Sequence, residues 1–241
     1  IGVTKAINWF FANESEGIIL EDDCVPYPDF LPFAEELLEK YRDDSRVWCI
    51  AANNIQKGKL RGNSSYYFSR YCHCWGWASW RRCWQHYDSE LNNWPIVKKS
   101  RVLDKIFNKK RESTYWKNVF DNLYFKSKPD TWDYQWAYTC WLNSGLTIIP
   151  NKNLIHNVGF GIDGTHTTSG VSPTINLEKS SDDSKFFPLV HPDFILRDTC
   201  ADLFTELDNF SGPSLVSFHG IFKLLKKIKN RLLRITKRLY L

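Results

Sequence analysis

The stretch "GIILEDDCVPYPDF", Gly17 to Phe30, joins an apolar run to three consecutive acids. Its residues 18–20 form a short apolar run, which is typical of a buried strand of the parallel type. The run leads directly into Glu21, Asp22 and Asp23, whose negative charges repel one another. Desolvating three acids at the end of an apolar strand costs free energy unless they find compensating partners. The stretch therefore predicts a strand and raises the question of what its acids do.

Helical periodicity flanks this strand on both sides. Before it, a helix is predicted to end within residues 13–17, from the apolar residues Val3, Ala6, Ile7, Phe10 and Phe11. After it, a second helix is predicted to start at Pro28, with an inner face of Phe30, Phe33, Ala34, Leu37, Leu38 and Tyr41. Residues 46–54, "RVWCIAANN", then predict another strand. Helix, strand, helix, strand at this spacing indicates a layered α/β fold.

The rest of the chain continues this pattern and then loses it. An aromatic segment at 66–87 precedes a Lys-rich helical stretch around 97–126. A helix is predicted to begin near Trp132, followed by a strand at 146–151 and a Gly-rich loop at 157–170. Residues 170–215 are rich in Ser, Pro and Asp, and we expect an irregular extension there.

Length and cysteine content bound the class of protein. The 241 residues suit one domain with appendages. Seven Cys is too sparse for a disulfide framework, which favours a reducing cytoplasm. No apolar run approaches the roughly 20 residues of a membrane-spanning helix. The chain starts at Ile1 and contains no Met, so we expect that it lacks its natural start.

The positive charge is concentrated at the C-terminal end. The net charge is +5, and residues 221–241 hold eight Lys and Arg and no acid, which leaves 5 − 8 = −3 for the rest. The charge balance therefore does not favour a basic nucleic-acid-binding body, and nucleic acid is not an expected partner. One apolar stripe runs through this segment, formed by Ile221, Leu225, Ile228, Leu232, Ile235 and Leu239. It predicts an amphipathic helix at 219–241 lying on an anionic membrane surface; a coiled-coil seam and a helix docked on the body are the alternatives.

Carboxylates at a strand end suit a hard cation. Ligand sites in α/β folds lie at the carboxyl ends of strands, and Mg²⁺ or Mn²⁺ takes carboxylate oxygens together with substrate phosphates. A bound cation would also explain how Glu21, Asp22 and Asp23 tolerate one another. A solvated loop is the alternative.

The segment "GIILEDDCVPYPDFLPFAEELLEKY" resembles the metal-binding segment of GT-A-fold glycosyltransferases. The resemblance is to the branch that includes N-acetylglucosaminyltransferase I and bacterial nucleotide-diphospho-sugar transferases, some labelled hemolytic-protein-like. It implies that Asp23 contacts Mn²⁺ or Mg²⁺, which bridges the nucleotide diphosphate. It also implies that Glu21 and Asp22 face the nucleotide sugar or a neighbouring water.

Two further segments match the same family in order. "YCHCWGWASWRRCW" is similar to its Gly-aromatic stretch, which implies acceptor contacts for Trp75, Gly76 and Trp77. "PDTWDYQW" resembles its Trp-Asp motif, which implies that Asp133 is the catalytic base and that Trp132 lies beside the acceptor. In "IIPNKNLIHNVGFGIDGTH", the resemblance makes His166 a candidate metal ligand.

The resemblance implies a GT-A-like mixed sheet flanked by helices and an inverting, metal-dependent glycosyltransferase. The expected donor is a nucleotide sugar, and the expected acceptor is a glycan, lipid-linked or protein hydroxyl. The predicted organisation is a catalytic domain at 1–168, the irregular extension at 169–218 and the basic helix at 219–241. We expect a cytoplasmic protein at the inner face of a membrane. The upstream nucleotide-binding half, about 80–100 residues, is expected to be missing.

Other interpretations of the same residues stay open. Asp133 also suits a first-turn acid that stabilises a helix. Among Trp75, Trp77 and Trp80, core packing is expected for at least two. The rival functions are a membrane-lytic protein acting through its basic helix and a Mg²⁺-dependent phosphoryl-transfer enzyme, although the Asp-x-Asp nucleophile pattern of the latter is absent. A zinc site is a further alternative, with Cys72, His73, Cys74, Cys83 and His86 as its ligands.

Overall fold

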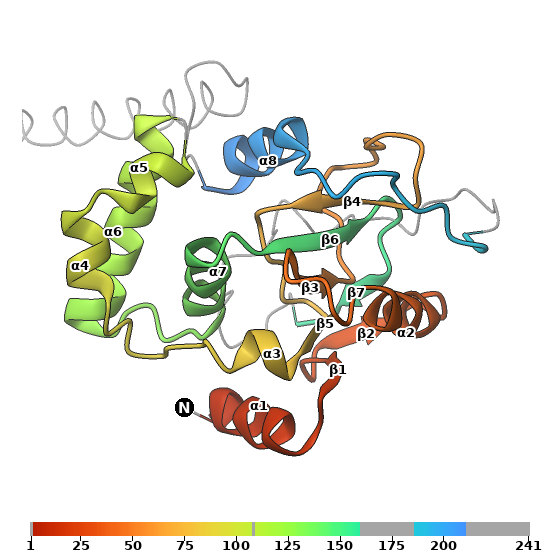
Figure 1. Cartoon of the computed structure of the whole chain (residues 1–241), viewed down its shortest axis with the longest axis horizontal. Coiled ribbons are helices and arrows are strands. Elements are labelled where there is room, and N and C mark those ends of the chain that lie inside the picture. The colour runs from red at the N-terminus through yellow and green to blue at the C-terminus, as the bar shows by residue number, and fades with distance from the viewer. Residues whose placement is uncertain (1, 108, 160–185, 211–241) are drawn as a thin grey trace, which may run out of the picture.

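The protein has a mixed α/β architecture in which helices flank a five-stranded mixed sheet (Figure 1). It is seen in a computed structural model that describes residues 2–107, 109–159 and 186–210. The sheet has the order β1-β5-β3-β6-β4, and a second, two-stranded sheet pairs β2 with β7. The strands are β1 (Glu16–Ile19), β2 (Cys24–Pro26), β3 (Val47–Ala51), β4 (Tyr66–Ser69), β5 (Trp77–Trp80), β6 (Leu146–Pro150) and β7 (Ile155–Asn157).

Three strands of the main sheet run in the same direction. β3 and β6 are parallel, and β1 shares the direction of β3 because both pair antiparallel with β5. The carboxyl ends of β1, β3 and β6 therefore meet at one edge of the sheet. This is the edge at which α/β folds place their ligands, and the acids after β1 lie there.

The central strands are covered on both faces, which explains their continuous apolar sequences. Helix α2 (Phe30–Lys40) packs on one face, where Trp80 Nε1 donates a hydrogen bond to the Leu38 carbonyl. Trp77, three residues earlier in the same strand, points to the opposite face because strand side chains alternate. There it contacts Trp136 of α7 (Asp133–Leu142), with ring centroids 5.6 Å apart.

A second core lies beyond α7. It is built with α4 (Trp94–Lys99), α5 (Val102–Ile106) and α6 (Lys110–Lys126), which form one end of the molecule in Figure 1. Its largest buried side chains are Tyr71, Trp94, Phe107, Trp116, Phe120, Tyr138 and Trp141. At the other end of β5, α3 (Arg81–Trp84) packs against α1 (Gly2–Asn13). The Lys-rich stretch is thus helical as predicted, and it is divided among three helices.

Two sequence predictions about the fold are wrong. β1 is not a buried strand of the parallel type: it is a half-buried edge strand whose one partner, β5, is antiparallel. The expected irregular extension contains α8 (Thr199–Thr205) and the π-helix η1 (Glu206–Phe210). The buried Asp202 of α8 accepts a hydrogen bond of 2.6 Å from Ser69 Oγ, which ties this segment to β4.

The helices predicted from residues 3, 28 and 132 are confirmed, as are the strands at 46–54 and 146–151. His166 and the predicted basic helix at 219–241 lie outside the described residues. Among the helices that the structure describes, none is both long and apolar enough to cross a membrane.

Candidate functional site

The three acids lie in a tight turn between β1 and β2. The turn is closed by a backbone hydrogen bond of 3.0 Å from Cys24 N to the Glu21 carbonyl. β2 then pairs with β7, and Val158 N donates 2.8 Å to the Asp23 carbonyl. The chain that follows β7 is therefore held against the acidic turn. Within this turn Glu21 and Asp23 are half-buried, and Asp22 is exposed.

The acidic turn is joined to the start of α7 through Trp132. Its Nε1 donates a hydrogen bond of 3.2 Å to Glu21 Oε1. Burial raises the pKa of Glu21, the Trp132 N–H opposes that rise, and the nearby charges of Asp23, Asp133 and Asp22 add to it. A cation at this position would relieve the repulsion among the carboxylates.

Asp133 is the first residue of α7, and both of its carboxylate oxygens have donors. The Thr131 hydroxyl donates to Oδ1, and Cys74 Sγ donates to Oδ2 over 3.7 Å. The positive end of the helix dipole also favours a negative charge at this position. The predicted role as a first-turn acid is therefore confirmed. The same contacts hold the carboxylate in one orientation beside Glu21, which is what a general base requires.

The Gly-aromatic stretch contributes packing more than exposed surface. Trp77 has no accessible surface, and its ring stacks on Trp132 at a centroid distance of 5.5 Å. Gly76 is buried too, with φ at +64°, and its carbonyl accepts 2.9 Å from Ala52 N. Trp77 and Gly76 therefore present little or no surface for the expected acceptor contacts, which stay a prediction. Trp75 is half-buried and keeps accessible surface for such a contact, whereas only 9% of the surface of Trp132 is accessible.

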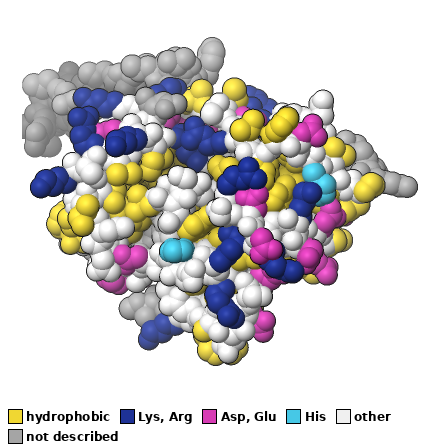
Figure 2. Space-filling model, viewed as in Figure 1, with side chains coloured by type: hydrophobic (Ala, Val, Ile, Leu, Met, Phe, Trp, Pro, Cys, Tyr) yellow, Lys and Arg dark blue, Asp and Glu magenta, His cyan; other side chains and the backbone are white. Residues whose placement is uncertain are grey.

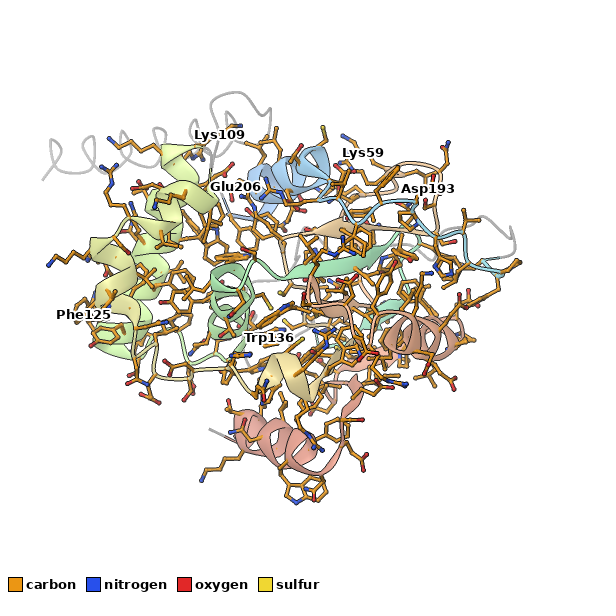
Figure 3. The ribbon with its side chains drawn as sticks, in the orientation of Figure 1. Lys59, Lys109, Phe125, Trp136, Asp193 and Glu206 are labelled. Atoms are coloured by element: carbon orange, nitrogen blue, oxygen red, sulfur yellow. The ribbon has the colours of Figure 1, made fainter. Side chains whose placement is uncertain are left out.

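The expected packing role of the tryptophans is confirmed for Trp77 and Trp80, both of which are buried. Trp136 extends this aromatic layer from α7 (Figure 3). Its ring lies 5.1 Å from that of Trp84, measured between centroids. Trp132 packs on this aromatic layer through Trp77, so the indole that contacts Glu21 has little freedom to move.

Sequence reasoning missed Gly159. A Cβ atom there would lie 2.2 Å from Asp23 Oδ2, so the bare backbone of this loop passes directly over the carboxylate. Gly159 N also donates 2.8 Å to Asn157 Oδ1, which fixes the loop just after β7. The glycine in "NVGFG" was the available signal, but its partner Asp23 lies far away in the sequence.

The donor set at the turn fits a hard divalent cation. Among the described residues, one group of three metal-ligating side chains has its ligand atoms within 4.8 Å of one another: Glu21, Asp23 and Cys24. Burial raises the pKa of the Cys24 thiol to about 12, and that thiol donates to Asp23 Oδ1 over 3.4 Å. A hard cation takes oxygen ligands in preference to sulfur, which leaves the two carboxylates of Glu21 and Asp23. One or two carboxylates with substrate phosphates is the usual donor set for Mg²⁺.

The zinc alternative is not supported. No three of Cys72, His73, Cys74, Cys83 and His86, all within the described residues, have their ligand atoms within 4.8 Å of one another. His86 packs its ring on Trp48 instead, with centroids 5.5 Å apart. All seven cysteines are free in this structure.

No known protein-family model matches this chain, and no curated protein matches it either.

Proposed function

We propose that the protein is a metal-dependent glycosyltransferase of the GT-A type, which moves a sugar from a nucleotide-sugar donor to an acceptor hydroxyl with inversion. One observation carries the proposal: the Trp132–Glu21 hydrogen bond joins the acidic turn to the segment that holds Asp133, although the two residues are 111 positions apart. A metal-holding carboxylate group beside a fixed acid is the minimum that inverting transfer requires.

The residues would divide the work as follows. Glu21 and Asp23 would hold Mn²⁺ or Mg²⁺, and the exposed Asp22 would face the donor or a water beside the ion. When bound, the cation supplies positive charge that stabilises the diphosphate leaving group. His166 remains part of the proposal as a further ligand.

Asp133 would take the proton of the acceptor hydroxyl at one carboxylate oxygen as that hydroxyl attacks the sugar. Thr131 and Cys74 would keep the carboxylate oriented. Trp75 would contact the acceptor, and the buried aromatic layer below Trp132 would keep water out from underneath. Attachment to an anionic membrane through residues 221–241 would bring lipid-linked or envelope glycan acceptors close to this site.

The first test is transfer activity. Asp133→Asn keeps the shape of the side chain but removes the base, so we expect transfer to fall by about 10²–10⁴-fold. Donor binding should survive. The matched control is Asp130→Asn, an exposed acid in the same loop, which should leave turnover unchanged. Unchanged turnover in Asp133→Asn would remove the proposed base.

The second test is Mn²⁺-dependent binding of a nucleoside diphosphate by the full-length protein, measured by calorimetry. Asp23→Ala should abolish it, whereas Asp43→Ala, an exposed acid elsewhere, should not. Equal binding by both variants would contradict the metal assignment. Product analysis with nucleotide sugars and with phosphomonoesters separates the glycosyltransferase from the phosphoryl-transfer alternative.

A further inference from the structure

Charge is strongly segregated within the folded body. Residues 94–128, which span α4, α5 and α6, contain ten Lys and Arg against three Asp and Glu, a net charge of +7. The other residues that the structure describes, 2–93, 129–159 and 186–210, contain 12 Lys and Arg against 20 Asp and Glu, a net charge of −8. Within the described part of the chain, one end is therefore cationic and the rest anionic. This separation is independent of the basic segment at 221–241.

Large apolar side chains are exposed at the same cationic end. Ile96 of α4 is 72% exposed and Phe125 of α6 is 68% exposed. Tyr124 lies beside Phe125, with ring centroids 5.0 Å apart. Figure 2 shows hydrophobic side chains gathered over this end with Lys and Arg beside them, and Figure 3 shows Phe125 at the outer end of α6.

One lysine lies against Phe125, and three more are exposed on the same elements. Lys98 Nζ lies 5.9 Å from the centre of the Phe125 ring and also pairs with Asp121 at 2.8 Å. Lys99, Lys126 and Lys128 are exposed on the same helices and the loop that follows α6. We call the surface formed by Ile96, Lys99, Phe125, Lys126 and Lys128 the α4–α6 surface.

We infer that the α4–α6 surface docks on an anionic lipid bilayer. Aromatic and aliphatic side chains on a Lys-rich helical face suit insertion at the headgroup boundary, with the lysines reaching the phosphates. Nucleic acid would satisfy the lysines but would leave Ile96 with no apolar partner. The net charge of −8 on the other described residues would also be repelled by the bilayer, so it favours one orientation with the α4–α6 surface facing the lipid.

Docking in this way would bring the candidate site close to the membrane. Lys128 precedes Asp133 by five residues, and five residues span no more than about 18 Å even when fully extended. The inference does not depend on the proposed function. If both hold, the acceptor hydroxyl belongs to a molecule at the lipid surface.

The test is a lipid titration of the full chain by vesicle flotation. The vesicles are phosphatidylcholine with or without phosphatidylglycerol, and the measured quantity is the partition coefficient. The triple variant Lys99→Glu, Lys126→Glu, Lys128→Glu should lower partitioning onto phosphatidylglycerol vesicles by about tenfold or more. The matched control carries the same charge change on exposed lysines elsewhere: Lys5→Glu, Lys40→Glu, Lys59→Glu.

An apolar pair of variants tests the second half of the surface. Ile96→Ser with Phe125→Ser should lower partitioning by about fivefold or more. Its control is Leu60→Ser with Phe194→Ser, both of which are 73% exposed in the wild type. Because all of these side chains are largely exposed, we expect every variant to fold, and circular dichroism checks this.

The inference stands if both α4–α6 variants lose partitioning and both controls keep it within about twofold. It is overturned if the control triple loses as much as the α4–α6 triple, because the effect is then one of net charge alone. Wild-type partitioning that does not require phosphatidylglycerol also overturns it. So does loss of binding to duplex DNA or RNA by the α4–α6 triple when vesicle binding is unaffected.

Discussion

Gly76→Ala is the substitution that most directly tests how the site is assembled. Gly76 has φ at +64°, and a Cβ atom there would lie 2.3 Å from Ile155 Cδ1 and 3.1 Å from Leu20 Cδ2. The left-handed backbone costs a non-glycine residue about 1–2 kcal/mol. Overpacking a well-filled core costs about 1–3 kcal/mol more. We therefore expect the free energy of unfolding to fall by about 2–5 kcal/mol.

Gly58→Ala is the matched control, because Gly58 has a similar φ of +78° but no atom within 4 Å of the added methyl group. Gly58→Ala should therefore show only the cost of the left-handed backbone. Both variants are also stabilised equally, by about 0.4–1 kcal/mol, because alanine makes the unfolded chain less flexible. Urea denaturation of the two variants and the wild type measures the difference.

The packing contribution is the excess loss in Gly76→Ala over Gly58→Ala, about 1–3 kcal/mol, with an unchanged denaturant slope. Equal losses in the two variants would refute the reasoning. They would mean that Ile155 and Leu20 move aside freely, so the ends of β1 and β7 are not locked together beneath the acidic turn.

Two further predictions concern the site and its surroundings. Gly159→Ala forces the Asp23 carboxylate away from its position. We therefore expect the Mn²⁺ affinity measured by calorimetry to fall by about 10–100-fold, with little change in the free energy of unfolding. An unaltered affinity would contradict Asp23 as a metal ligand. Burial lowers the pKa of His73 from 6.5 to about 4, so the unfolded chain takes up a proton that the folded protein resists. The free energy of unfolding should therefore fall by about 3 kcal/mol as the pH drops from 6.5 towards 4, because only the unfolded chain protonates His73 in that range. His73→Leu should flatten that part of the urea-derived stability profile, and an identical acid dependence in the variant would count against it.

The amphipathic elements were predictable because their signal is local. Phe30, Phe33 and Leu37 recur at helical spacing, and all three are fully buried on the inner face of α2. The unbroken apolar run of β3 likewise reflects a strand with both faces covered, since every residue from Val47 to Ala51 is buried.

The strands β4 and β5 were not predicted. Both are buried along their whole length, so Tyr66–Ser69 and Trp77–Trp80 show no alternation of apolar and polar residues. β1 was misjudged for a related reason: its apolar residues look the same whether the neighbouring strand is parallel or antiparallel. The neighbour, β5, lies about 60 residues along the chain, and only pairing in three dimensions identifies it.

For the site, the sequence alone determined which chemical groups are available and where each local element begins. It indicated that Glu21 to Asp23 follow a strand and that Asp133 opens a helix, because both facts depend on neighbouring residues. The contact of Trp132 with Glu21, the passage of Gly159 over Asp23 and the burial of Trp77 are seen only in the folded protein. Those contacts join segments separated by 111 or more residues in the first two cases. Their formation depends on how whole faces pack together, which the spacing of residues along one segment does not encode.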